Sequence, residues 1–220
     1  GIWRSTDGGL NWQRSLSTNN SKAQDLKADP SNFLTQYCAV NNDGVYKSTD
    51  GGINWTKSSG GITTSGRIEI SVSSKNPNYI YASAQTTSGS ALYLSEDKGT
   101  TWLTINSSDG KNNNWLSTQG WYDNTIAVQP DNEKIVFFGG IDLWKAEVQN
   151  AGSSSTTRTA IFSHVTDGYN QYGKPYVHVD HHNLTLVPLA SSPGTFWIVN
   201  GNDGGISYST NGGTTWSGNS

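Results

Sequence analysis

A Ser-x-Asp/Asn-x-Gly-x-x-Trp pattern occurs four times in these 220 residues. The four copies are STDGGLNW (Ser5 to Trp12), STDGGINW (Ser48 to Trp55), SEDKGTTW (Ser95 to Trp102) and STNGGTTW (Ser209 to Trp216). The first three acidic positions are 43 and 47 residues apart, which is the length of one four-stranded propeller blade. The repeat therefore predicts a chain built from blades.

Each copy of the pattern lies between two short strand-like segments, of which the first is aromatic (GIWRS, DGVYKS, ALYLS and GGISYS). The aspartate can accept backbone N–H groups inside a turn, while glycine adopts the positive φ values that such turns need. The tryptophan then returns the chain into the space between neighbouring sheets. Each copy predicts a β-hairpin.

The remaining strands are marked by apolar runs that end in a turn, such as DLKADPSN from Asp25 and TIAVQPDN from Thr125. Because 114 residues separate Asp97 from Asn211, a blade without the pattern must lie between them, and it continues into the Ser/Thr-rich stretch EVQNAGSSSTTRTA. These boundaries predict a half blade at 1–16 and four fuller blades near 22–60, 66–106, 120–166 and 178–220.

The predicted fold is an all-β propeller of four-stranded blades, because no segment keeps a helical 3.6-residue apolar period. The half blade lacks its two inner strands. A propeller must close to protect its sheet edges, and about four and a half blades close poorly. We therefore interpret the chain as a fragment of a larger propeller.

The composition limits the classes of partner that the chain could bind. The net charge of −3 and the scattered lysines and arginines argue against nucleic acid, and no apolar run reaches the roughly 18 residues that span a membrane. The single cysteine, Cys38, lies in a strand-like segment and is expected to be buried. Abundant Asn, Ser, Thr and Gly with 19 Trp and Tyr residues are typical of a secreted or cell-surface bacterial protein that meets sugars.

The four patterns resemble the Asp-box or BNR repeat, and the resemblance covers essentially the whole chain. That repeat occurs in sialidases, xyloglucan-cleaving endoglucanases, sortilin-type receptors and photosystem assembly factors. In these relatives the box lies on the outer hairpin of a blade, away from the active face. The resemblance therefore implies a structural role for the box residues Asp7, Asp50, Asp97 and Asn211.

Within this group, the chain is least similar to sialidases, which clamp a carboxylate with three arginines, because its four arginines carry no Arg-Ile-Pro signature. It is more similar to the xyloglucanase type, in which two propellers face each other and each supplies a catalytic Asp. One of those acids follows an aromatic residue just before an inner strand. QGWYDNTIAVQPDN (Gln119 to Asn132) has this form and places Asp123 at the corresponding position. The second propeller and its Asp are not recognisable.

The loop Asn112 to Asn124 is the first candidate site. It surrounds Asp123 with Trp115, Trp121 and Tyr122. Aromatic rings stack on the apolar faces of sugars, and a half-buried carboxyl group with a raised pKa suits a general acid. Alternatively, the tryptophans pack between blades and Asp123 caps a turn.

The segment Gly173 to Pro188 is the second candidate site. An extended strand would place His178, Asp180 and His182 on one face and His181 on the other. These side chains could contact a ligand, ligate a metal or hydrogen-bond to neighbouring blades. Same-face neighbours lie almost 7 Å apart along a strand, which is wide for one metal ion. We expect neither a metal nor a cofactor.

Two hypotheses follow for the function. The first is a glycoside hydrolase-like module that acts on a polysaccharide, with Asp123 and Asp180 as acid and base and with Trp115, Trp121 and Tyr122 as sugar platforms. Inverting hydrolysis requires two such carboxyl groups about 6.5–9.5 Å apart. The second is a non-catalytic propeller, an adhesin or scaffold that binds glycan or protein, and a sialidase-like function is third. Another propeller domain of the same protein is a possible partner in either case.

Overall fold

The computed structural model describes residues 1–58, 60–111, 113–149 and 154–218, and its regular structure consists of strands. At the N-terminus, β1 (Ile2–Arg4) and β2 (Gln13–Leu16) form an antiparallel pair, which we call the half blade. The first blade follows, with the strands β3 (Ala23–Asp29), β4 (Asn32–Val40), β5 (Gly44–Ser48) and β6 (Thr56–Lys57). Asn112, in the first candidate loop, lies outside the described residues.

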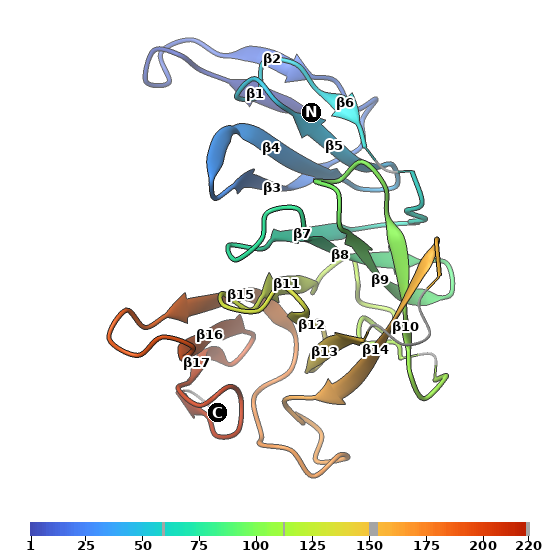
Figure 1. Cartoon of the computed structure of the whole chain (residues 1–220), viewed down its shortest axis with the longest axis vertical. Coiled ribbons are helices and arrows are strands. Elements are labelled where there is room, and N and C mark those ends of the chain that lie inside the picture. Colours follow the sequence, from blue (N-terminus) through green and yellow to red (C-terminus); the bar gives the residue numbers. More distant parts are fainter. Residues whose placement is uncertain (59, 112, 150–153, 219–220) are drawn as a thin grey trace.

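Three more blades repeat this antiparallel order. The second consists of β7 (Ile68–Val72), β8 (Ile80–Thr86), β9 (Gly89–Ser95) and β10 (Leu103–Ser107). The third consists of β11 (Thr125–Val128), β12 (Ile135–Gly139), β13 (Leu143–Gln149) and β14 (Thr157–His164). The fourth consists of β15 (His181–Pro188), β16 (Phe196–Asn202), β17 (Gly205–Ser209) and β18 (Ser217–Gly218). The first strand of each blade is the innermost, and β3, β7, β11 and β15 lie next to one another in Figure 1.

Four apolar clusters hold the fold together, one at each junction between successive units. Leu16 of the half blade packs on Cys38 and Val40 of the first blade. Tyr37 and Ile68 belong to the cluster between the first and second blades. The cluster between the second and third blades contains Leu116 and Phe138. The cluster between the third and fourth blades contains Phe137, Leu184 and Ile198. Burial of apolar area between sheets therefore sets the order of the blades.

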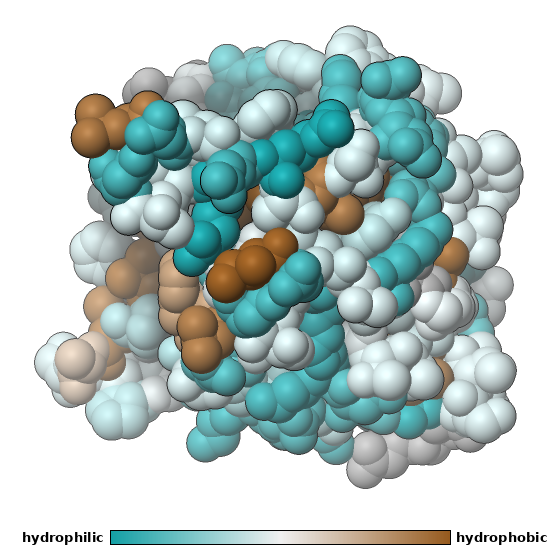
Figure 2. Space-filling model, turned by 90° about the horizontal axis from the view of Figure 1, so that it is seen from above, coloured by the Kyte–Doolittle hydropathy of each residue, from teal (hydrophilic) through white to brown (hydrophobic). Residues whose placement is uncertain are grey.

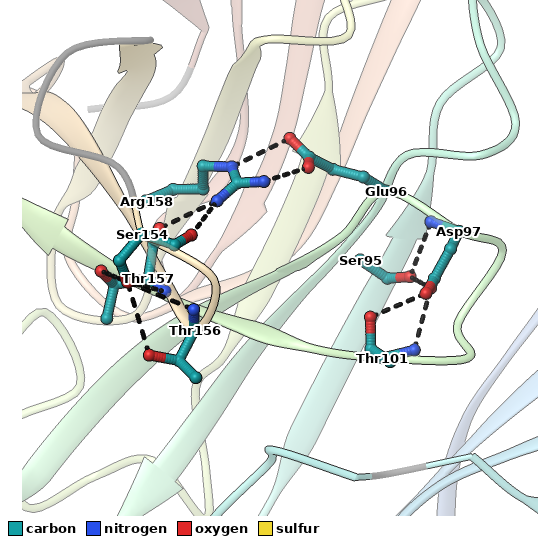
Figure 3. A network of polar contacts seen from close by, with 8 residues as sticks. All are labelled: Ser95, Glu96, Asp97, Thr101, Ser154, Thr156, Thr157 and Arg158. Atoms are coloured by element: carbon teal, nitrogen blue, oxygen red, sulfur yellow. Dashed lines mark hydrogen bonds and ion pairs between the residues drawn. The ribbon is translucent and has the colours of Figure 1, made fainter.

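The third blade lacks the Asp-box turn, and its outer strand behaves differently. β14 pairs antiparallel with β13 and also parallel with β10 of the second blade, so that the two blades share one eight-stranded sheet. Beside this seam, the guanidinium of Arg158 donates two hydrogen bonds to the carboxylate of Glu96, at 3.1 and 2.5 Å (Figure 3). Glu96 lies inside the Asp-box turn of the second blade, so this ion pair joins that turn to the outer strand of the third blade.

The N-terminal end presents separate apolar patches on a largely hydrophilic surface (Figure 2). Exposed apolar side chains of the first 34 residues are Trp3, Leu10, Trp12, Leu26, Phe33 and Leu34. Among the described residues, no helix is long and apolar enough to cross a membrane.

Candidate functional site

The Asp-box residues stabilise their own turns. The carboxylate of Asp50 accepts the backbone N–H groups of Ile53 and Asn54, at 3.1 and 2.9 Å, and the hydroxyl of Ser48. These bonds hold the pKa of Asp50 down at about 2, chiefly through the N–H of Asn54. Two of these contacts, with the serine hydroxyl and with the N–H four residues on, recur at the other three boxes, around Asp7, Asp97 and Asn211.

Asp123 lies at the end of the loop that leads into β11, and it is completely buried. Neither of its carboxylate oxygens makes a hydrogen bond of normal geometry. Burial, together with the nearby negative charge of Asp180, raises the pKa of Asp123 to about 8. Asp123 is therefore largely protonated at neutral pH, and a substrate can reach it only if the loop moves.

Asp180 lies on the segment that enters β15, with a left-handed φ of 64° that is uncommon for a residue other than glycine. Its N–H donates to the carbonyl of Ile141 at 3.3 Å, and the side-chain amide of Gln119 donates to its carboxylate at 3.0 Å. The strand begins only at His181. The prediction that His178, Asp180 and His182 share one face of a strand is therefore wrong, because the chain turns at Asp180.

The three histidines of this segment have different environments. His181 is buried, with Nδ1 2.7 Å from the side-chain oxygen of Asn200 and Nε2 without a partner, and burial lowers its pKa to about 4. His178 contacts the carbonyl of Val179 through Nδ1 at 3.0 Å. His182 is partly exposed. His178 is partly exposed as well, and His182 is set apart by its contact with the ring of Tyr122.

An exposed aromatic group lies beside His182. The side chain of Trp121 is 71% exposed, and its ring lies 5.5 Å from that of Tyr122. The ring of Tyr122 meets the imidazole of His182 edge to face at 4.7 Å. Both residues bind Asp203, the tyrosine hydroxyl at 2.9 Å and Nε2 of His182 at 2.6 Å. We call Trp121, Tyr122, His182 and Asp203 the aromatic platform.

Trp115 does not belong to this platform. It is only 3% exposed, packs edge to face on Phe138 at 4.7 Å and donates its indole N–H to Ser83 at 2.9 Å. The prediction that Trp115 is a sugar platform is wrong, because its ring is almost completely buried in the junction between the second and third blades.

Arg67, at the start of the second blade, binds the backbone of the platform loop. Its guanidinium donates to the carbonyls of Tyr122 and Asn124 at 2.7 and 3.4 Å, on either side of Asp123. It also pairs with Glu69 at 2.7 Å, and both side chains of this pair are only 13% exposed. Burial raises the pKa of Glu69 to about 8. Together with the amide of Asn124, which donates to the carbonyl of Ser83 at 3.0 Å, this guanidinium fixes the loop across a blade boundary.

A groove of about 460 Å³ follows the inner strands and reaches the platform. Its lining includes Lys27 of the first blade, Glu69 of the second, Thr125 of the third and His182 of the fourth. Within the described ranges, no group of three or more His, Cys, Asp or Glu side chains could hold a metal ion.

Sequence reasoning missed three of the residues that build this site: Asp203, Gln119 and Arg67. Asp203 lies in an Asn-Asp-Gly segment, a sequence that by itself indicates only a turn. The equivalent Asp43 gives a hint in hindsight, because it also binds a tyrosine hydroxyl, that of Tyr46, at 2.7 Å. Arg67 had no local signal, since both of its loop contacts lie more than 50 residues away.

The sequence matches the profile of the Sortilin-Vps10 family, described as sortilin, neurotensin receptor 3, over residues 1–167. A search of curated proteins gave no match. Among solved structures, 57 chains match. YCF48 from Cyanidioschyzon merolae superposes with a TM-score of 0.52 and 19% identity, over 98% of this chain and 65% of that chain.

Two glycoside hydrolases also match, with lower scores. The GH74 enzyme of Niastella koreensis gives a TM-score of 0.31 and 20% identity, over 99% of this chain and 47% of that chain. The GH74 xyloglucanase from Xanthomonas campestris gives 0.34 and 13%, over 99% and 48%. The chain thus spans about half to two thirds of the proteins it matches. The predicted fold class, a fragment of a larger all-β propeller, is confirmed.

Proposed function

Since this chain belongs to the Sortilin-Vps10 family, whose description is that of a receptor, we propose that it is a binding propeller, and that its ligand is a neutral glycan. The aromatic platform is the binding site. Trp121 and Tyr122 stack on the apolar faces of the sugar rings, while Asp203, His182 and the partly exposed Asp180 hydrogen-bond to the hydroxyl groups. The proposal places the protein on the surface of a bacterial cell or outside it.

The observation that carries the proposal is the exposure of Trp121 on a loop that is otherwise firmly held. A single exposed indole is common on protein surfaces. This one lies beside the ring of Tyr122, which in turn contacts His182, so the exposed indole belongs to an aromatic cluster. The neighbouring Tyr122 is fixed by Arg67 through its carbonyl and by Asp203 through its hydroxyl. A ligand therefore meets a preorganised aromatic surface, which lowers the entropy cost of binding.

The charges around the platform favour a neutral ligand. The carboxylates of Asp180 and Asp203 accept hydrogen bonds from sugar hydroxyls and repel anionic sugars. Arg67, the arginine that reaches the platform loop, is already bound to Glu69 and to two carbonyls. Arg158 and Arg4 are bound elsewhere, to Glu96 and to the carbonyl of Gly51. These pairings disfavour a sialidase-like site.

Titration calorimetry with a panel of neutral β-glucan oligosaccharides tests the proposal. We expect the wild-type protein to bind at least one member, and Trp121→Ala to bind it about tenfold or more weakly, because stacking contributes on the order of 1 kcal/mol beyond the buried area. Trp3→Ala removes another indole that is more than half exposed and serves as the matched control. Equal affinity of Trp121→Ala and wild type would refute the platform.

Glycoside hydrolysis is the second candidate, because Asp123 combines a pKa of about 8 with a carboxylate neighbour, Asp180. A protonated acid beside a charged one is the pattern of acid–base pairs in these enzymes. The complete burial of Asp123 counts against this function. Release of reducing sugar by the wild type, lost in Asp123→Asn while binding persists, would establish it. Absence of release over the whole panel would rule it out.

A further inference from the structure

The loop that connects β14 to β15, residues 165–180, displays three tyrosines that the platform does not use. Tyr169, Tyr172 and Tyr176 are 58%, 51% and 44% exposed. We infer that this tyrosine loop is a second subsite for the same neutral oligosaccharide chain that binds at the aromatic platform, and the inference rests on the proposed function.

One buried carboxylate holds the tyrosine loop in shape. Asp167 is completely buried and accepts the backbone N–H groups of Gln171 and Tyr172 at 2.7 and 2.5 Å. Its own N–H donates to the carbonyl of Pro175 at 3.0 Å, which closes the loop on itself. The N–H of Gly168 donates to buried Asp142 at 2.8 Å. A loop fixed in this way loses little conformational entropy when a ligand binds.

Tyr172 is the outer member of an aromatic stack. Its ring lies 3.6 Å from the imidazole of His164 at an interplanar angle of 20°. On the other side, the imidazole lies 3.6 Å from the ring of Trp144. Burial lowers the pKa of His164 to about 4, so the stack is uncharged at neutral pH. Since Tyr172 is half exposed, the stack offers a supported ring to a sugar.

The tyrosine loop and the aromatic platform lie at the same end of the blades, because both precede inner strands, β15 and β11. Tyr176 and Asp180 are four positions apart in the tyrosine loop, so their Cα atoms are at most about 14 Å apart. Gln119 links Asp180 in turn to the platform loop. One oligosaccharide can therefore contact both surfaces.

The composition of the tyrosine loop suits a neutral sugar. Between Gly168 and Tyr176 it presents tyrosine rings, the amides of Asn170 and Gln171 and a single charge, on Lys174. Tyrosine gives a large amphipathic surface with only two side-chain torsions to restrict, and amides supply adaptable hydrogen bonds. This combination matches ring faces edged with hydroxyl groups.

The test is calorimetry of the whole chain with disaccharides and hexasaccharides from the β-glucan panel, on wild type and Tyr172→Ala. We expect Tyr172→Ala to weaken hexasaccharide binding about tenfold and to leave disaccharide binding unchanged. Because Tyr172 also supports His164, the double variant Tyr169→Ala/Tyr176→Ala provides a second test without touching the stack. Tyr208→Ala, which removes an exposed tyrosine of the fourth blade, is the matched control.

The outcomes separate this inference from the proposed function. If wild type binds, Trp121→Ala abolishes binding and both tyrosine-loop variants bind hexasaccharides normally, the second subsite is wrong and the platform stands. If the tyrosine-loop variants weaken the binding of disaccharides and hexasaccharides equally, the role of the loop as a second subsite for longer chains is also wrong. If wild type binds no member of the panel, the proposed function fails, and the inference with it.

Discussion

The second and third blades are joined differently at their outer and inner edges. At the outer edge, β10 and β14 share a parallel ladder over Thr104 to Ser107, and the Arg158–Glu96 pair lies beside it, 21% and 29% exposed (Figure 3). At the inner edge, the guanidinium of Arg67 crosses between the blades, as do hydrogen bonds from the amide of Asn124 to the carbonyl of Ser83 and from the N–H of Val128 to the hydroxyl of Ser71. The same edge contains a fully buried acid, Asp123, whose carboxylate oxygens have no hydrogen-bond partner.

The difference separates a structural junction from a functional one. The outer edge satisfies its backbone groups in a sheet and keeps its charges paired near water, as folding requires. The inner edge buries ionisable groups whose charged forms are disfavoured, which costs stability. Departures from the rules of folding concentrate at functional sites. The inner edge is also where the aromatic platform lies.

The largest effect is expected when Arg67 is removed. Arg67→Ala leaves the buried Glu69 without its hydrogen-bond donor and frees the carbonyls of Tyr122 and Asn124, so we expect a loss of about 2–4 kcal/mol in the free energy of unfolding. Urea unfolding followed by tryptophan fluorescence measures it. Arg67→Lys keeps the charge but not the forked geometry, so its free energy of unfolding should lie between those of wild type and Arg67→Ala. A loss below about 1 kcal/mol would contradict the assignment of Arg67 as a clamp.

The inner edge also predicts a pH dependence. The pKa of Asp123 is raised to about 8, so the native state holds a proton that the unfolded state releases near pH 4. The contribution of this proton to the stability of the native state is complete below about pH 4 and is lost as the pH rises through 8. Asp123→Asn removes this dependence and should be more stable than wild type at pH 9, by about 2 kcal/mol, with a smaller difference at pH 5. Thermal unfolding across this range measures it.

A control for this prediction is Asp109→Asn. Hydrogen bonds led by that of Ser107 lower the pKa of Asp109 to about 2, so its titration is complete well below the alkaline range. Its stability curve should run parallel to that of wild type above pH 5. Glu69, whose pKa is also raised to about 8, remains in Asp123→Asn and should leave a residual slope. If the curves of stability against pH for Asp123→Asn and wild type run parallel, Asp123 does not cause the pH dependence.

The fold was predictable from the sequence because its information is local. The hydrogen bonds of each Asp-box turn connect residues at most five positions apart, and the alternation of the flanking strands marks their buried faces. The site was predictable only in part. Asp123, Trp121 and Tyr122 were marked by their place before an inner strand, whereas Trp115, in the same loop, turned out to fill a junction.

What could not be predicted depends on contacts between blades. The pairing of Tyr122 with Asp203 joins residues 81 positions apart, and β14 meets β10 through a ladder that no local pattern announces. The turn at Asp180 was missed for a related reason. Its left-handed φ accompanies contacts with Ile141 and Gln119, which lie in another blade and in the loop before it.

The smallest effect is expected at the outer edge, and it is the sharpest check on the comparison. Arg158→Ala removes a pair that is partly open to solvent, so the loss should be about 1 kcal/mol or less, and it should shrink further in high salt because the charges are screened. Glu96→Gln and the double variant complete a cycle that isolates the pair from the ladder beside it. Urea unfolding at low and high salt measures all four proteins. If Arg158→Ala costs as much as Arg67→Ala, then the two edges carry equal electrostatic weight. In that case the buried charges of the inner edge no longer distinguish it as the functional one.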